Sequence, residues 1–406
     1  PQRWGDCPWN FLSKDDPLRT KFITTKNQNL RPDIWIQITI PSEFQAVGSA
    51  YNIGVSAGIE TTIFPAAFID GMNRMDLNLV SSEHSKKAAF NSQFEKRDKN
   101  NKVERVIKLE KPCEVLFEGL DLDKYFKNPA KSDVLEGIQE EFCFLYTGHW
   151  LNGKLGEDRK NTGLLIKTFL ETFNGPGNKK PALILKTNNV NYSILDQEGI
   201  LKKINNIKNQ VKGNLPNIYL LHGEMTDEEM NLLNNDPKVK AFVSFTKGEG
   251  YGRPLAEAAI TGKPTIVSNW SGHLDFLKPD YNILIGGQLK NVHPSAANDW
   301  LIKESQWFNI YDNVASKAMK DVFKHYKKYS VGSRKQTQYI KNNFSFDKMV
   351  EVLKGQLPIL TANPNPSLPN SSPNSNIPLN LPKLKKVGKT TSKPKLTLPK
   401  LKKIEA

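Results

Sequence analysis

The sequence predicts an α/β protein with two doubly wound, Rossmann-like domains and a cleft between them. Its 406 residues are enough for two domains of roughly 100–200 residues each. In both halves of the chain, short apolar runs alternate with segments of helix length, which is the pattern of parallel α/β packing. One apolar run, at 241–245, passes through a glycine-rich loop into a helix, as at the ligand-binding edge of such a sheet.

The first domain is predicted to span residues 1–130 and to begin with parallel strands. Apolar and β-branched runs place these strands at 33–40, 51–55 and 77–80. After the third strand, Ser81-Ser82-Glu83-His84 is typical of a helix start, and we expect that helix to run to Phe90. The lysine-rich stretch 85–112 carries nine basic and four acidic residues and is interpreted as a solvated face.

The second domain is predicted to span residues 131–330 and to repeat the alternation. An apolar strand that ends in Gly148 opens it, and helical spacing follows at 161–173. Further strands are expected at 182–185, 218–221, 241–245 and 265–268. Ligands of such domains bind beyond the carboxyl ends of the strands, so we expect the site at that edge.

The end of the chain differs in composition from the rest. Residues 361–406 contain nine lysines, one glutamate and eight prolines, so they carry +8 of the net charge of +15 and leave +7 for 1–360. This segment lacks aromatic residues and is predicted to be a disordered basic tail. The hexapeptide Leu-Pro-Lys-Leu-Lys-Lys occurs in it twice, at 381–386 and at 398–403. A docking or anion-binding arm is the alternative to a solvated tail.

The composition also argues against several classes of protein. The sequence has no run of about 18 apolar residues, so no transmembrane helix is predicted. The three cysteines lie far apart and the six histidines lack HxxxH or HxH spacing, which argues against a disulfide scaffold and a zinc site. Neither a P-loop nor a GxSxG motif occurs, so an NTPase or a serine hydrolase is not expected. We expect a reducing compartment, namely the cytoplasm of a bacterium or of a phage-infected host.

The stretch 241–272 is the most informative about chemistry. A strand ends at Phe245, three glycines follow at alternate positions, and Pro254 occupies the first turn of the next helix. Glycines let backbone N–H groups approach a ligand closely, and a helix N-terminus carries about half a positive charge. The loop therefore suits a phosphate or a diphosphate.

Two glutamates, Glu249 and Glu257, frame this loop. Glu249 lies in the loop itself, and Glu257 lies about one turn into the helix, on a face that can reach back toward the loop. Carboxylates accept hydrogen bonds from paired hydroxyls, so one glutamate is a candidate for holding a sugar and the other for holding a ribose. The spacing alone equally allows one loop charge and one solvated helix charge.

These residues resemble the signature of the retaining nucleotide-sugar glycosyltransferases with the GT-B fold, specifically family 4. The matching residues are Glu249-Gly250-Tyr251-Gly252-Arg253-Pro254, Glu257, Gly262-Lys263-Pro264 and Ser271-Gly272. Weaker similarity extends over most of residues 33–350, including Gly148-His149-Trp150 and the downstream Glu157-Asp158-Arg159-Lys160-Asn161. The resemblance implies two Rossmann-like domains with the donor between them, followed by helices at 331–360 that cross back to the first domain.

The resemblance also implies roles for the matching residues. Glu249 would contact the donor sugar and Lys160 would be the main contact of the diphosphate, so both are candidate catalytic residues. Further donor-binding candidates are Gly148, His149, Lys154, Arg159, Gly250, Tyr251, Gly252, Arg253, Pro254, Glu257 and Gly272, with Glu257 on the ribose. His149 stands where the family usually has an arginine, so Lys154 or Arg159 is expected to supply that charge. No cofactor is implied, and no metal ion is expected.

Two features of the first domain differ from the family. The loop Ser56-Ala57-Gly58-Ile59-Glu60-Thr61 lacks the histidine that often meets the sugar there, and Glu60 is a candidate for a related polar role. The family begins with a strand, a glycine-rich loop and a helix, whereas only about 30 residues of loop-like sequence precede residue 33 here. The first strand–helix unit is therefore expected to be missing from this chain.

We therefore expect a retaining glycosyltransferase that moves a sugar from a nucleotide-diphosphate-sugar donor to a hydroxyl group of a glycan or other saccharide. One alternative is a phage-type enzyme that glycosylates modified DNA bases, with a polyanion contact through the basic tail. Nucleic-acid-binding segments normally interleave aromatic residues with lysines, and this tail has none. A second alternative, of another class, is a catalytically weak binding module with the GT-B shape, against which the intact Glu249 and Glu257 count.

Overall fold

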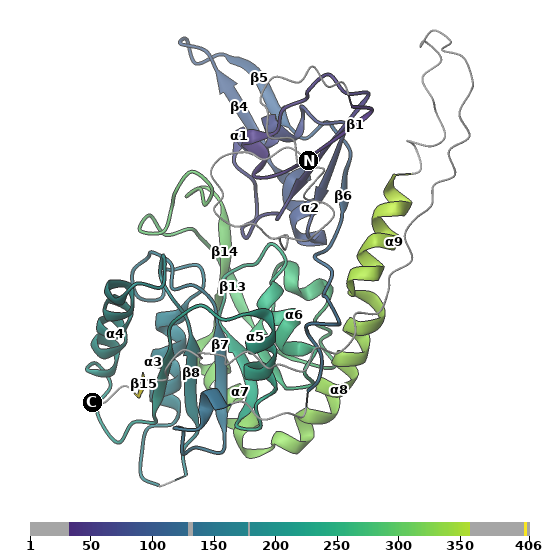
Figure 1. Ribbon diagram of the computed structural model, residues 1–406. Helices are drawn as coiled ribbons and strands as arrows, with labels where there is room; N and C mark the ends of the chain where they lie inside the picture. The colour runs from purple at the N-terminus through teal and green to yellow at the C-terminus, as the bar shows by residue number, and fades with distance from the viewer. Residues whose placement is uncertain (1–31, 129–132, 178, 358–401, 404–406) are drawn as a thin grey trace, which may run out of the picture.

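The computed structural model describes residues 32–128, 133–177, 179–357 and 402–403, and the structural statements below refer to these ranges. Within them the chain forms two α/β units, each built around its own parallel sheet, and a pair of long helices runs alongside both (Figure 1). The predicted disordered tail lies outside these ranges, apart from β15 (Lys402–Lys403), which pairs antiparallel with an edge strand of the second sheet.

The N-terminal unit, residues 33–116, contains a four-stranded parallel sheet. Its strands, in spatial order, are β1 (Ile34–Ile38), β2 (Tyr51–Ser56), β3 (Leu77–Val80) and β6 (Cys113–Val115). The three strands predicted for this region are confirmed. Helix α1 (Ala66–Met72) precedes β3 and helix α2 (Glu83–Asn91) follows it. The Oγ atom of Ser82 caps α2 by accepting a hydrogen bond from the Ser85 N–H, which confirms the predicted helix start.

The lysine-rich stretch 85–112 contains more structure than a solvated face. Its central part forms an antiparallel hairpin of β4 (Gln93–Arg97) and β5 (Val103–Lys108), which projects away from the rest of the molecule (Figure 1). Phe94 and Ile107 face each other across the hairpin and pack against the core of the N-terminal unit. The basic side chains are thereby left on the surface, which confirms the solvated face, and the hairpin is an element that the sequence did not predict.

The C-terminal unit, residues 143–324, is built on the second sheet. Its six parallel strands are β7 (Cys143–Thr147), β8 (Ala182–Lys186), β9 (Ile218–Leu221), β10 (Val239–Ser244), β11 (Thr265–Ser268) and β12 (Ile283–Ile285). The spatial order is β12-β11-β10-β7-β8-β9-β15. All the strands predicted for this region are present, and β12 is an addition. The order reverses between β7 and β10, which is the point where doubly wound sheets bind ligands.

Helices cover both faces of this sheet, so its strands are almost entirely buried. On one face lie α3 (Thr162–Thr172), α4 (Ile194–Lys208) and α7 (Asp312–Lys324), whose apolar residues share a core with the sheet. On the other lie α5 (Asp227–Asn235) and α6 (Arg253–Ala259). Both predicted helices are confirmed, and Pro254 lies in the first turn of α6, as the sequence predicts. This burial on both faces explains why the strands are continuous apolar runs.

A second hairpin, which the sequence did not predict, lies next to the loop that follows β10. Strands β13 (Gly287–Asn291) and β14 (Gln306–Ile310) pair antiparallel, and Trp307 anchors their connection in a small core of its own. The backbone of β14 is fixed to the neighbouring loop, because the Phe308 N–H donates to the Lys247 carbonyl oxygen over 2.9 Å. The hairpin therefore helps to position the loop that follows β10.

The last two helices connect the two units. Helix α8 (Tyr326–Asn343) packs on α6, and α9 (Phe346–Gln356) continues along the N-terminal unit (Figure 1). Gln356 donates a side-chain hydrogen bond to the Val115 carbonyl oxygen over 2.8 Å, and Leu353 packs against the sheet of the N-terminal unit. The described residues thus include a helix that crosses back, while the exact domain boundaries stay predictions. Among these residues, no helix combines the length and apolar character needed to cross a membrane.

Candidate active site

The two candidate catalytic residues meet at the reversal point of the second sheet. Lys160 lies in the connection from β7 to α3, and Glu249 lies in the loop from β10 to α6. The Lys160 Nζ atom donates to both carboxylate oxygens of Glu249, over 2.6 and 2.8 Å, and both side chains are buried. The fold therefore brings together two residues that the sequence assigned to one site from separate motifs.

The protonation states of this pair follow from burial and from charge. Burial alone would raise the pKa of Glu249, but the ammonium of Lys160 and the guanidinium of Arg159 hold that pKa at about 2. Burial lowers the pKa of Lys160, and the Glu249 carboxylate opposes this effect. Glu249 is therefore a carboxylate at neutral pH, so it can accept hydrogen bonds but has no proton to donate.

Arg159 extends this pair to the N-terminal unit. Its Nη1 atom lies 3.4 Å from Glu249 Oε2 and 3.3 Å from Glu60 Oε1. Glu60 belongs to the loop after β2, so the second contact is an ion pair between the two units. Burial works against the charge of Arg159, yet the two carboxylates hold its pKa above the ordinary value. The four side chains form what we call the charge cluster, which consists of Glu60, Arg159, Lys160 and Glu249.

The glycine loop, residues 248–252, packs directly against the N-terminal unit. A Cβ atom on Gly248 would overlap the carbonyl oxygen of Glu60, and one on Gly250 would overlap that of Ala57. The Ser82 hydroxyl donates to the Gly250 carbonyl oxygen, which fixes the contact from the other side. These two glycines are therefore needed for the approach of one backbone to another, in addition to any approach to a ligand.

A turn after β11 holds the backbone of Glu249. The Glu249 N–H donates to Ser271 Oγ over 2.9 Å, and the Gly272 N–H donates to the Glu249 carbonyl oxygen over 3.0 Å. Gly272 leaves no room for a side chain, because its Cβ would overlap the Gly250 carbonyl oxygen. His273 is buried next to this turn, and burial lowers its pKa. The turn thus fixes the position from which the Glu249 side chain reaches Lys160.

Glu257 lies in a different group of polar residues from Glu249. Arg253 Nε donates to Glu257 Oε1 over 2.9 Å, one turn apart on α6. Tyr125, from the segment that joins the two units, donates to Asp227 Oδ1 over 2.8 Å, and burial together with the nearby Glu257 carboxylate raises the pKa of its hydroxyl. Burial raises the pKa of Glu257 to about 7, although Arg253 opposes the rise. Within the described residues, no hydrogen bond or ion pair joins Glu257 to the charge cluster, so its assignment to a ribose stays a prediction.

The residues after β7 divide into those near the charge cluster and those away from it. Gly148 ends the strand close to the Lys160 side chain, with its N–H bonded to the Lys186 carbonyl oxygen. His149 is exposed beside the same lysine, whose charge adds to burial in lowering the pKa of the imidazole. Lys154 is exposed, and its N–H donates to Ser295 Oγ over 3.1 Å. Arg159, and not Lys154, therefore supplies the second cation of the charge cluster.

The donor-binding candidates at the start of α6 could contact a ligand mainly through their backbone groups. Tyr251 is buried in the core, where its ring packs on Phe276 with centroids 4.8 Å apart. Gly252 adopts a left-handed conformation, with φ of 100°, and precedes the first residue of the helix. Arg253 is exposed and Pro254 occupies the first turn, as predicted. A side-chain contact from Tyr251 to a donor would require the core to open.

Two residues of this region escaped the reasoning from sequence, and a third, Ser271, was matched to the family signature without a role. Ser271 has a positive φ of 87°, and its hydroxyl accepts the hydrogen bond from the Glu249 N–H. Glu118 is half-buried close to Arg253 and Glu249, and burial raises its pKa. Lys247 is buried and donates to Asn309 Oδ1 over 2.6 Å. In the sequence, Lys247 is only a polar residue shortly after a predicted strand, so its burial could not be predicted.

Known proteins resemble this chain in fold and not in sequence. No protein-family model matches the sequence, and no curated protein matches it. A glycosyltransferase from Rickettsia africae ESF-5 is 12% identical, with a TM-score of 0.54 over 86% of this chain and 87% of that chain. Sucrose-phosphate synthase from Thermosynechococcus elongatus is 10% identical, with a TM-score of 0.50 over 77% and 68%. HepE of Anabaena in complex with UDP-glucose is 12% identical, with a TM-score of 0.50 over 76% and 72%. The chain has the GT-B fold of these glycosyltransferases, as predicted.

Proposed function

We propose that this chain transfers a sugar from a nucleotide-diphosphate-sugar donor to a hydroxyl group of a glycan or other saccharide, with retention of configuration. The observation that carries the proposal is the buried contact of Lys160 with Glu249 at the reversal point of the second sheet. The GT-B fold supports the class of reaction, and one of the solved structures with this fold is HepE in complex with UDP-glucose. No metal ion or cofactor enters the proposal.

In the proposed complex the diphosphate lies against the positive side of the charge cluster. Lys160 and Arg159 are the two cations there, with His149 and Gly148 beside Lys160 and the backbone of 250–252 at the start of α6. Fixed cations in a buried site stabilise negative charge more than they would in water. The departure of the nucleoside diphosphate, which gains negative charge, is the step that they would assist.

Glu249 would orient the sugar and the two cations at once. Its carboxylate stays ionised because its pKa is about 2, so it accepts hydrogen bonds from sugar hydroxyls while it holds Lys160 in place. A general-acid role does not fit this ionisation state. Glu257, whose pKa is about 7, is the carboxylate that we assign to the ribose hydroxyls, with Arg253 as its anchor.

The proposed reaction breaks the bond between the anomeric carbon and the phosphate oxygen, and the nucleoside diphosphate leaves with the electron pair. The acceptor hydroxyl oxygen forms the new bond to the anomeric carbon on the same face. Its proton passes to the departing phosphate oxygen, so atoms and charge balance without a protein base. The contribution of the chain is position and charge: Lys160 and Arg159 on the leaving group and Glu249 on the sugar.

The test is a screen of nucleotide sugars on the full chain, read as hydrolysis of the donor and as transfer to oligosaccharides. A second arm offers hydroxymethylated DNA as the acceptor. Glu249→Ala and Lys160→Met are expected to abolish turnover, while Glu136→Gln, which changes an exposed glutamate, serves as the matched control. Turnover that persists in Glu249→Ala with a folded chain would refute the proposal, as would transfer with inversion for the retaining part of it.

A further inference from the structure

A cavity of about 450 Å³ lies next to the charge cluster but is lined by other residues. Its walls come from the loop before α3, the first turn of α3, the loop after β10, the β13–β14 hairpin and the start of α7. Neither Lys160 nor Glu249 lines it, although Asn161 and Lys247, their near neighbours in sequence, do. The volume is within the range of small-molecule sites. The proposed function uses none of the lining residues.

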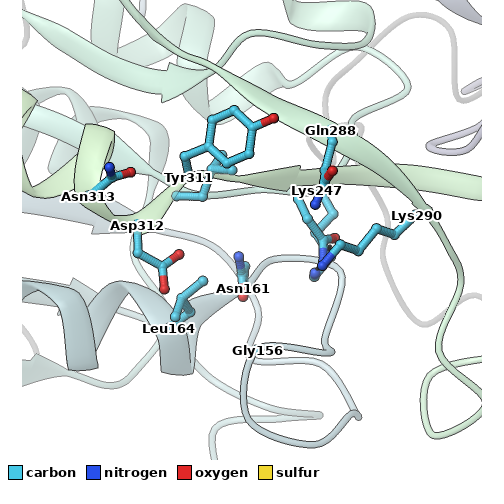
Figure 2. Close-up of a pocket in the computed structure, with 11 residues that line it drawn as sticks. Gly156, Asn161, Leu164, Lys247, Gln288, Lys290, Tyr311, Asp312 and Asn313 are labelled. Atoms are coloured by element: carbon cyan, nitrogen blue, oxygen red, sulfur yellow. Dashed lines mark hydrogen bonds between the residues drawn. The ribbon is translucent and has the colours of Figure 1, made fainter.

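The two ends of the cavity differ in chemistry (Figure 2). At one end lie Lys247 and Lys290, whose amino groups approach each other. At the other end lie Asp312 and Asn313, at the start of α7. The first end offers two ammonium groups to an anion, and the second offers a carboxylate and an amide to hydroxyl groups. A ligand that fits both ends therefore carries one anionic group and several hydroxyls.

Asn161 lies between these two ends and has no partner for its side chain (Figure 2). The residue is fully buried and left-handed, with φ of 55°, and neither its Nδ2 nor its Oδ1 atom forms a hydrogen bond among the described residues. A buried amide without a hydrogen-bond partner destabilises the folded state, because it has lost its hydrogen bonds to water. Its position in the wall of a polar cavity gives it a direct way to be satisfied, namely a polar ligand.

The local structure adds to the positive character around Asn161. The residue precedes α3, a helix of 11 residues, and its side chain does not cap that helix. Asp158 accepts one of the first N–H groups, that of Thr162, over 3.3 Å. The remaining dipole of the helix end favours negative charge nearby. Lys247 is also expected to favour an anion in the cavity. Burial lowers the pKa of Lys247 to about 8, and the charge of Lys290 adds to the decrease. An anion beside Lys247 would stabilise its charged form.

We propose that this cavity is a second ligand site, which binds a monosaccharide-sized polyol with one anionic group, such as a sugar phosphate. Lys247 and Lys290 hold the anionic group, Asn161 bonds the middle of the ligand, and Asp312 with Asn313 bonds its hydroxyls. The site is separate from the donor contacts assigned above. It therefore stands or falls independently of the proposed transfer reaction.

The test is calorimetric titration of the full chain with glucose 6-phosphate, glucose and inorganic phosphate, in the presence of saturating UDP. Glucose 6-phosphate is expected to bind at least tenfold more tightly than either fragment. Lys290→Glu is expected to weaken this binding at least tenfold, because the residue is exposed on β13 and its replacement reverses one charge of the site. Lys303→Glu makes the same charge reversal in the connection from β13 to β14, outside the cavity, and is expected to leave binding unchanged.

Three outcomes would overturn the proposal. The first is no detectable binding of glucose 6-phosphate at millimolar concentration. The second is equal affinity in Lys290→Glu and Lys303→Glu, which would place the bound ligand elsewhere. The third is equal affinity for inorganic phosphate and glucose 6-phosphate, which would leave an anion site without hydroxyl recognition. A further variant, Asn161→Gly, keeps the left-handed backbone and removes the amide; it is expected to weaken binding severalfold, and unchanged affinity would remove Asn161 from the site.

Discussion

The contact between Lys160 and Glu249 predicts a measurable coupling energy in the folded chain. The pKa of Glu249 falls from 4.5 to about 2, and this group is only 7% exposed. At about 1.4 kcal/mol for each pKa unit, the surroundings favour the carboxylate by about 3 kcal/mol. Arg159 supplies part of this at 3.4 Å, so we expect the pair itself to contribute about 2 kcal/mol. The stabilisation is fully present above pH 4.5 and is lost as the pH falls through about 2.

The assay is a double-mutant cycle of Lys160→Met and Glu249→Gln, with the free energy of unfolding measured in urea at pH 7. Each single variant leaves a buried group without its partner, so each is expected to be destabilised by about 3 kcal/mol. The double variant is expected to be more stable than the sum of the two losses predicts, by about 2 kcal/mol. A coupling energy no larger than that of an exposed ion pair would show that the buried contact does not form in solution. Lys167→Met with Glu171→Gln, an exposed pair on α3, is the matched control, for which a coupling of about 0.5 kcal/mol is expected.

Three further predictions test other parts of the site. Glu257→Gln should reduce the loss of stability between pH 4.5 and pH 7, because a carboxyl whose pKa is raised on folding stabilises the folded state only while it remains protonated; an unchanged profile of unfolding free energy against pH would contradict the assignment. Glu60→Gln should strengthen UDP binding about threefold to tenfold, since it releases Arg159 for the diphosphate, and weaker binding in calorimetry would oppose that reasoning. Gly250→Ala should lower the melting temperature and donor turnover together, since the new methyl group overlaps the Ala57 carbonyl oxygen; wild-type values of both would mean that the units do not pack this closely.

The alternation of apolar runs was sufficient to predict most of the fold. The strands of the second sheet and the inner strands of the first are largely buried, so their apolar character is continuous, whereas β1 is apolar although it is mostly exposed. All seven predicted strand ranges agree with the observed ones to within two residues at each end. The two hairpins were missed for a physical reason. β13 is mostly exposed and contains one apolar residue, Leu289. In β5, Val103, Val106 and Ile107 are interrupted by charged residues within a lysine-rich stretch, so the strand was not distinguished from a solvated segment. Only Phe94 and Ile107 reveal that the first hairpin has a buried face.

The sequence predicted those parts of the candidate site that one loop places by itself. The positions of Glu249 and Lys160, in the connections that follow β10 and β7, agree with the order of the strands, because both connections border the reversal point. The ion pair of Arg159 with Glu60 depends instead on how the two units pack, which no local pattern encodes. The burial of Glu257 likewise depends on the packing of distant segments. Its ion pair with Arg253 could be inferred from their spacing of four residues on a helix, but its burial could not.

The glycines of the glycine loop serve two different structural purposes, although they form one sequence motif. Gly252 provides a left-handed backbone before α6, with φ of 100°. Gly248 and Gly250 provide room, since side chains at these positions would overlap carbonyl oxygens of the N-terminal unit. Substitution at Gly252 is therefore expected to strain the loop itself, whereas substitution at Gly250 is expected to separate the two units. The motif is a docking surface for the N-terminal unit as much as a candidate phosphate loop.

This dual role connects the packing of the units to the charge of the site. The charge cluster contains two cations and two carboxylates, and one of its contacts, between Arg159 and Glu60, joins the units. An anion that attracts Arg159 competes with Glu60 and so weakens that contact. By thermodynamic linkage, whatever stabilises the contact between the units must then lower the affinity for the anion by the same factor. The proposed donor is therefore expected to bind with a measurable change in the relative position of the two units, and Glu60→Gln is expected to reduce the part of that change that depends on the ion pair.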